Sequence, residues 1–156
     1  MHAPRETRIR ALVLSNLIAI YEKTGIGRLS AYCGAVSAGA AAAAGVAYLH
    51  GEDYETVIHT VVNALAASSG IVCDGAKASC AAKIALSVYS GLMGYEMYKR
   101  GQQFKAGDGL VAKGVEATLD NIAALASQGM YETNLEIIRM MTDILSGMEK
   151  TKGEEQ

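Results

Sequence analysis

Apolar residues recur with helical spacing along almost the whole chain, and this pattern constrains the fold more than any other feature. One such stripe consists of Ile9, Leu12, Val13, Leu17 and Ile20. The only proline is Pro4, so no later segment carries the residue that interrupts helices most strongly. No segment alternates as half-buried strands do. The sequence therefore predicts an all-α fold, a single compact bundle of about six helices.

Glycines and capping residues predict where these helices begin and end. We expect helices at about 6–23, 30–49, 53–69, 76–100, 110–129 and 133–147. The second is rich in Ala and Gly, which lets other backbones approach closely, and we expect it at the centre of the bundle. Together the helices form one domain over residues 1–147, and a polar tail at 148–156 is expected to fray.

Two of the predicted helix starts have a specific capping signal. Asp53 is placed as the N-cap of the third helix. Thr133 with Glu136 is typical of a capping box for the last helix. The expected core stripe of that last helix is Leu135, Ile138, Met141 and Leu145.

Net charge argues against one kind of partner and composition against another. A net charge of −2 leaves no basic face for a phosphate backbone, so no nucleic-acid partner is expected. Residues 31–50 contain no formally charged side chain and are long enough to span a bilayer. They are mainly Ala and Gly, however, and nearly lack the apolar residues that drive membrane insertion. We expect a buried helix and no membrane partner, with an Ala-rich membrane hairpin as the alternative.

The three cysteines cannot all pair with one another within the chain. The opening MHAPRETRIR has no apolar core typical of a secretion signal. An odd cysteine count without such a signal indicates a reducing compartment, here the cytoplasm, and thiol or metal chemistry.

The cysteine spacing favours a bulky ligand over a single small ion. Cys80 follows Cys73 by seven positions, which in one regular helix separates them by roughly 10 Å along the axis. They can converge if Cys73 lies in the link before the helix and Asp74-Gly75 bends the chain, with Asp74 as a cap. Cys33 would approach from the second helix. Such a set suits an iron–sulfur cluster better than zinc, although spacing alone equally allows three buried thiols.

Two segments around the cysteines resemble the L-cysteine desulfidase family, which is related to the α chain of the iron–sulfur L-serine dehydratases. They are CGAVSAG at 33–39 and IVCDGAKASCAAK at 71–83, and 73–80 is the most specific part. The likeness extends from Arg10 to Met130. It implies a 4Fe-4S cluster on Cys33, Cys73 and Cys80, no pyridoxal phosphate, and a lyase. That lyase would convert L-cysteine or L-serine to pyruvate and ammonia, with loss of H2S or water.

The chain resembles only the C-terminal portion of this longer family. The family's proposed proton-abstracting base lies in the part that has no counterpart here, so no catalytic residue is carried over. We therefore expect an N-terminal domain or separate subunit as partner beside the small amino-acid substrate, and a homo-oligomer is compatible with the sequence. The alternative is a non-catalytic helical module that binds a cluster or a partner protein.

Three polar residues are candidates for binding substrate. Lys77, between two of the cysteines, can bind a substrate carboxylate or offset cluster charge, or extend to the domain rim as a solvated side chain. Asn63 can bind substrate or satisfy a neighbouring backbone group. Ser79 adjoins the predicted ligands. His59 is interpreted as a boundary residue, and Lys83 as a solvated or cluster-rim charge.

Overall fold

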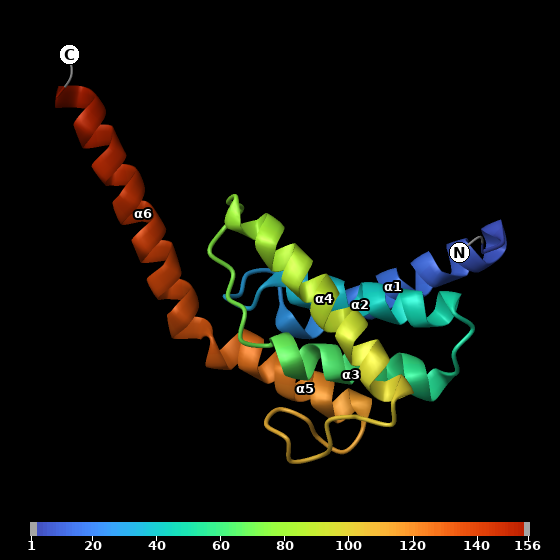
Figure 1. Cartoon of the computed structure of the whole chain (residues 1–156). Helices are drawn as coiled ribbons and strands as arrows, with labels where there is room; N and C mark the ends of the chain where they lie inside the picture. The colour runs from blue at the N-terminus through green and yellow to red at the C-terminus, as the bar shows by residue number, and fades with distance from the viewer. Residues whose placement is uncertain (1–2, 155–156) are drawn as a thin grey trace.

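The computed structural model describes residues 3–154, and its helices are laid out in Figure 1. They are α1 (Arg5–Ile26), α2 (Gly34–Leu49), α3 (Tyr54–Ser68), α4 (Ser79–Lys99), α5 (Val115–Ala124), a π-helical turn η1 (Leu125–Gly129) and α6 (Tyr131–Glu154). Over residues 3–154 the only β pairing is an isolated antiparallel bridge between Tyr32 and Val72. The prediction of an all-α fold is confirmed.

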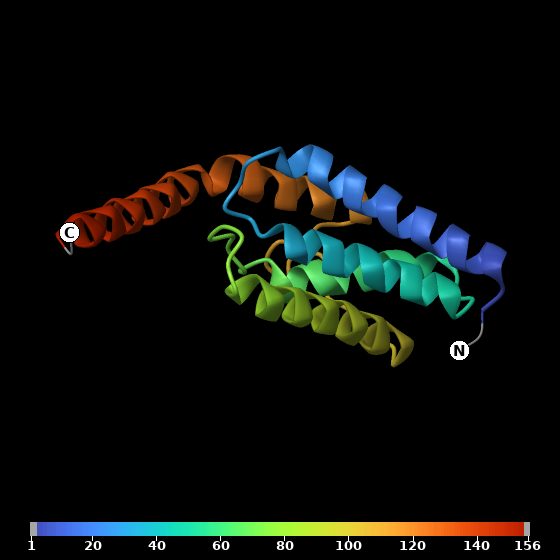
Figure 2. The same ribbon diagram turned by 90° about the horizontal axis from the view of Figure 1, so that it is seen from above.

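The Ala- and Gly-rich helix α2 lies between α1 and α4 (Figure 2). α3 packs against both α2 and α4, and α5 packs against α1. Among the helices described, α6 contacts only η1 and extends away from the others (Figure 1). Five helices thus form the bundle, and the sixth leaves it.

α2 and α4 cross with their backbones in contact. A Cβ added at Gly39 would lie 2.5 Å from the backbone C and O atoms of Ser87. A Cβ at Gly91 would lie 2.7 Å from the carbonyl oxygen of Gly39. The small residues of α2 are therefore required by the close approach of α4, since any side chain at these two glycines would push the helices apart.

The start of α3 follows the prediction. The Asp53 side chain accepts a hydrogen bond of 2.9 Å from the backbone N–H of Thr56, which confirms Asp53 as the N-cap. The helix then buries Val57, Val61 and Leu65, one per turn, against the bundle. These three residues belong to the core cluster that includes Ala40 and Ala44 of α2.

The apolar stripe that predicts α1 lies on its exposed side. Leu12 and Leu17 are 64% and 59% exposed, and Ile9, Val13 and Ile20 are exposed as well. The face that α1 buries instead includes Ala11, Glu22 and Ile26. α1 thus has apolar residues on two sides, and the described chain covers only one of them.

Two expectations for the last helix are wrong. α6 begins at Tyr131, so Thr133 lies inside the helix and is not a cap. Leu135 and Ile138 are 44% and 47% exposed because α6 leaves the bundle, so they form no core stripe. Leu145 lies outside the residues whose side chains are described. The expected tail at 148–156 falls on the last turns of α6, with 155–156 outside the described residues.

Other helix limits shift by a few residues. α1 continues to Ile26, beyond the predicted end, and α2 begins at Gly34 because residues 31–33 are used by the bridge. Among residues 3–154, no helix has both the length and the hydropathy needed to cross a bilayer.

Candidate functional site

The isolated bridge brings two of the three cysteines onto neighbouring segments. The N–H of Cys33 donates to the carbonyl of Ile71 at 3.2 Å, and the N–H of Cys73 donates to the carbonyl of Ala31 at 2.6 Å. Cys33 is also the N-cap residue of α2. Residues 31–33 and 71–73 therefore run antiparallel at one end of the bundle, although they are far apart in the sequence.

The third cysteine faces the same link from the first turn of α4. The Cys80 thiol donates a hydrogen bond of 3.2 Å to the carbonyl of Gly75. Gly75 has φ +88°, a conformation that glycine adopts without steric cost. The bend predicted at residues 74–75 is therefore present, and it turns the link that carries Cys73 toward Cys80.

Lys83 fastens this link to α4. Its ammonium donates to the carbonyl of Val72 at 2.9 Å and to the Asp74 carboxylate at 2.5 Å, and the side chain is only 17% exposed. The hydrogen bond to Asp74 raises the pKa of Lys83, and negative charge on the thiols of Cys33 and Cys80 acts in the same direction. Lys83 is thus a partly buried cation within electrostatic reach of two cysteines.

Asp74 does not cap α4, contrary to the prediction. The N-cap position belongs to Ala78, because the chain makes a further turn between the bend and the helix. The Asp74 carboxylate is used instead by Lys83, whose hydrogen bond lowers the pKa of Asp74. Lys83 is not the solvated charge that was one of its two interpretations, because its side chain is only 17% exposed, and the other interpretation, a cluster-rim charge, stays a prediction.

The three substrate-binding candidates occupy different places. Lys77 and Ser79 are exposed at the start of α4, beside Cys80. Asn63 is fully buried at the crossing of α3 and α4, where its amide donates to the carbonyl of Gly94 at 3.1 Å and accepts from the N–H of Phe104 at 3.0 Å. Both polar groups of its side chain therefore bond to backbone groups, which is the second of the two roles predicted for Asn63. The substrate-binding role of all three residues stays a prediction.

The cysteines are free thiols, with Cys33 buried and the other two partly buried. Within the described part of the chain, no three His, Cys, Asp or Glu side chains are grouped as they would be around a metal ion. The thiols of Cys33, Cys73 and Cys80 are nevertheless soft donors at this end of the bundle, where the bridge and the hydrogen bond from Lys83 to Val72 hold the segments of Cys33 and Cys73.

A buried acid near the bridge was not anticipated from the sequence. Glu22 of α1 is 5% exposed, and among the described residues neither of its carboxyl oxygens has a hydrogen-bond partner. Burial raises its pKa to about 8, an effect that the nearby Ser37 hydroxyl partly opposes. Glu22 in turn contributes to the raised pKa of Tyr32, whose main cause is burial. The only signal in the sequence is that Glu22 shares the helical face of Ala11 and Ile26.

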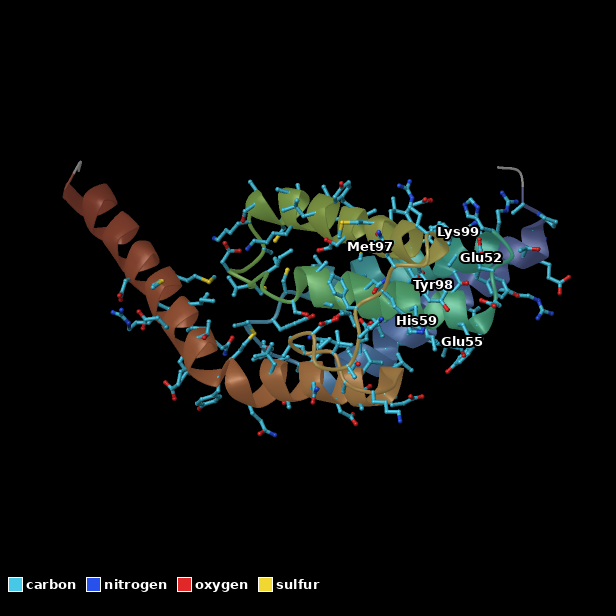
Figure 3. The ribbon with its side chains drawn as sticks, turned by 60° about the horizontal axis from the view of Figure 1, so that its bottom comes forward. Glu52, Glu55, His59, Met97, Tyr98 and Lys99 are labelled. Carbon is cyan, nitrogen blue, oxygen red and sulfur yellow. The ribbon has the colours of Figure 1, made fainter. Side chains whose placement is uncertain are left out.

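The opposite end of α4 carries a second polar cluster, shown in Figure 3. The Glu52 carboxylate accepts hydrogen bonds of 2.7 Å from both Lys99 and Tyr95. His59 stacks on Tyr98 with ring centroids 4.6 Å apart and is half-buried, as expected of a boundary residue. These contacts tie α4 to α3 and to the residues just before it, and they lie far along α4 from Cys80.

These features define an all-α domain with a thiol-bearing end. The family described as serine dehydratase alpha chain matches residues 1–139. The chain belongs to this family. It is 58% identical to a UPF0597 protein of Desulfitobacterium hafniense and 52% identical to one of Treponema denticola, over 90% and 87% of its length.

The chain spans about a third of the length of these curated relatives, 33% and 32% respectively. A UPF0597 protein of Chromobacterium violaceum is 40% identical over 90% of the chain, and the match covers 33% of that protein. No solved structure matches the chain significantly.

Proposed function

We propose that the chain is the cluster-bearing helical part of a lyase that needs no pyridoxal phosphate. The enzyme would eliminate H2S from L-cysteine, or water from L-serine, and the resulting aminoacrylate would hydrolyse to pyruvate and ammonia. The observation that supports this most is the Tyr32–Val72 bridge, because it holds the backbones of Cys33 and Cys73 side by side. Membership in the serine dehydratase alpha chain family supports the same reaction class.

The residue types at this end suit the chemistry of a 4Fe-4S cluster. Cys33, Cys73 and Cys80 would hold it, since thiolates are the usual protein ligands of such clusters. Held by three thiolates, a cluster supplies an iron that can act as a Lewis acid toward the leaving group of the substrate. Lys83 would offset part of its negative charge, being already close to two of the thiols.

Two helices begin at this end and add to its affinity for negative charge. α2 starts directly after Cys33, and α4 starts at Ser79. The N-terminus of a helix carries a partial positive charge and unpaired backbone N–H groups. The exposed Lys77 and Ser79 lie beside the second of these termini and are the residues that we propose to bind the substrate carboxylate.

The rest of the active site is proposed to come from outside this chain. The relatives are about three times as long, and the described chain leaves apolar faces exposed on α1 and α4. On α4 these residues are Ile84, Leu86, Val88, Tyr89 and Leu92, while Lys83, the only charged residue between 79 and 95, points to the link. A helix face that exposes apolar side chains and no charged ones is normally covered by another part of the protein or by a partner. An N-terminal domain or separate subunit would cover it and provide the base.

Anaerobic reconstitution with iron and sulfide tests the cluster assignment. We expect about four irons per chain by the stoichiometry of a 4Fe-4S cluster, with its absorbance and EPR signature after reduction. Substituting serine for any one of the three cysteines should abolish or greatly destabilise the cluster. Ser79→Ala is the matched control, because it lies on the first turn of α4 without being a ligand. Full cluster uptake by all three variants would refute the ligand set.

Turnover is tested by adding L-cysteine or L-serine to the reconstituted chain and measuring pyruvate. We expect little product from the chain alone and more when the remaining part of the family protein is supplied as a second polypeptide. A stable cluster without pyruvate in either case would instead favour the non-catalytic module.

A further inference from the structure

We propose that the Glu22 carboxyl, held as a neutral acid between α1 and α2, is the positioning residue for the Tyr32–Val72 bridge, which pairs the segments that carry Cys33 and Cys73. Its proton has to be in place for this bridge to stay closed. The relevance of the bridge to chemistry rests on the proposed function, but the bridge itself is a feature of the described chain.

The position of Glu22 connects it to the bridge through two neighbours. Ser37, one turn into α2 from Cys33, is close enough to the carboxyl to oppose the rise of its pKa, and among the described residues its buried oxygen also has no hydrogen-bond partner. Tyr32, a residue of the bridge, is fully buried and close enough to sense the charge of Glu22. Glu22 therefore neighbours one residue of the bridge and one residue of the first turn of α2.

Few other ionisable groups face Glu22. α2 carries none before Tyr48, and η1 carries none at all. The segment between α1 and α2 contributes the Tyr32 phenol and, next to it, the Cys33 thiol. From α5, the exposed Asp120 lines the same cavity of about 470 Å3 as Glu22 and Tyr21. No cation lines that cavity, so an ionised Glu22 would be left without compensation in an apolar site.

The pKa of the Glu22 carboxyl differs between the closed bridge, where it is buried, and an open bridge, where it meets solvent. In the closed state burial raises the pKa of Glu22 to about 8, whereas a solvent-exposed glutamate has an ordinary value of 4.5. At a pH between these two pKa values, opening of the bridge releases the proton of Glu22. Each unit of pH should therefore raise the equilibrium constant for opening about tenfold. Above the closed-state pKa both states are ionised and the dependence ends. The bridge is therefore most stable below the ordinary pKa and weakens as pH rises toward 8.

Hydrogen exchange of the metal-free chain tests this directly. The amides of Cys33 and Cys73 form the bridge, and the amide of Leu65 in α3 reports opening of the core. After correction for intrinsic exchange, we expect the opening constant of the two bridge amides to rise about 100-fold from pH 5 to 7. Glu22→Gln, a neutral isostere of the acid, should remove this rise and leave the bridge closed.

Glu6→Gln, an exposed position on the same helix, is the matched control and should retain the rise. A flat profile in the unmodified chain, or a rise that persists in Glu22→Gln, would overturn the proposal. So would equal opening constants at Cys33, Cys73 and Leu65, because Glu22 would then act on global stability alone. Since no cluster is present, these outcomes are independent of whether the three cysteines bind iron.

Discussion

Replacing Gly39 by alanine is expected to destabilise the bundle where α2 crosses α4. The added methyl carbon would lie 2.5 Å from the backbone C and O atoms of Ser87 and 2.8 Å from its Cβ. Backbone atoms cannot rotate away, so the two helices must separate. We expect an overpacking cost of about 3 kcal/mol, the upper part of the usual range. The better helix propensity of alanine returns about 1 kcal/mol.

The net loss is therefore about 2 kcal/mol, which in a domain of this size lowers Tm by about 4–8 °C. Urea unfolding followed by circular dichroism at 222 nm measures this loss in the free energy of unfolding. Gly34→Ala, at the start of the same helix, is the matched control, because a Cβ there meets nothing within 4 Å. It should leave stability unchanged or raise it by up to about 1 kcal/mol. Equal stability of the two variants would refute the backbone contact.

Three further changes test other contacts. Asn63→Asp keeps the acceptor for the amide of Phe104 but presents an anion to the carbonyl of Gly94. The free energy of unfolding, measured in urea, should fall by about 3 kcal/mol. A fall of less than about 1 kcal/mol would argue against these buried hydrogen bonds. Asp53→Ala should cost about 1 kcal/mol at neutral pH. Because hydrogen bonds from Thr56 lower the pKa of Asp53, that difference should shrink as pH falls below 3.8, and a constant difference would contradict the cap. Lys83→Met should speed labelling of the Cys73 and Cys80 thiols about five- to tenfold, whereas Lys77→Met should not.

Much of the fold could be predicted because it depends on local spacing. Apolar periodicity predicts each helix, and Asp53 marks the start of α3 through a contact only three residues away. The predicted end of the fourth helix at about residue 100 agrees with the end of α4 at Lys99, and Gly101 adopts φ +73° just beyond the last turn. These signals are contained within one or two helical turns, so they can be read without knowledge of the fold.

The orientation of a helix is harder to predict than its existence. α1 has apolar residues on two sides, and the larger ones, such as Leu12 and Leu17, lie on the exposed side. Periodicity gives the spacing of a stripe but not which stripe meets the bundle. The narrow surface of α2 selects the face with Ala11, and this choice buries the acid at position 22.

The candidate site was predictable only in part for a similar reason. The three cysteines and the bend at Gly75 are visible in the sequence, because their types and spacing are unusual. The pairing of Lys83 with Asp74 and the bridge of Tyr32 with Val72 are not, because each depends on how separate segments meet in space. The sequence therefore indicates which residues take part but not what holds them in place.

The π-helical turn at Leu125–Gly129 has a consequence for how this chain can change over evolution. A π turn accommodates one more residue than an α turn, and in an α-helix one residue corresponds to a rotation of about 100° around the axis. Deleting a single residue within this turn would restore ordinary helical register from α5 onward. The bundle would keep its packing, while the side chains of α6 would be presented in a new direction. One codon gained or lost at this turn would thus re-aim the terminal helix.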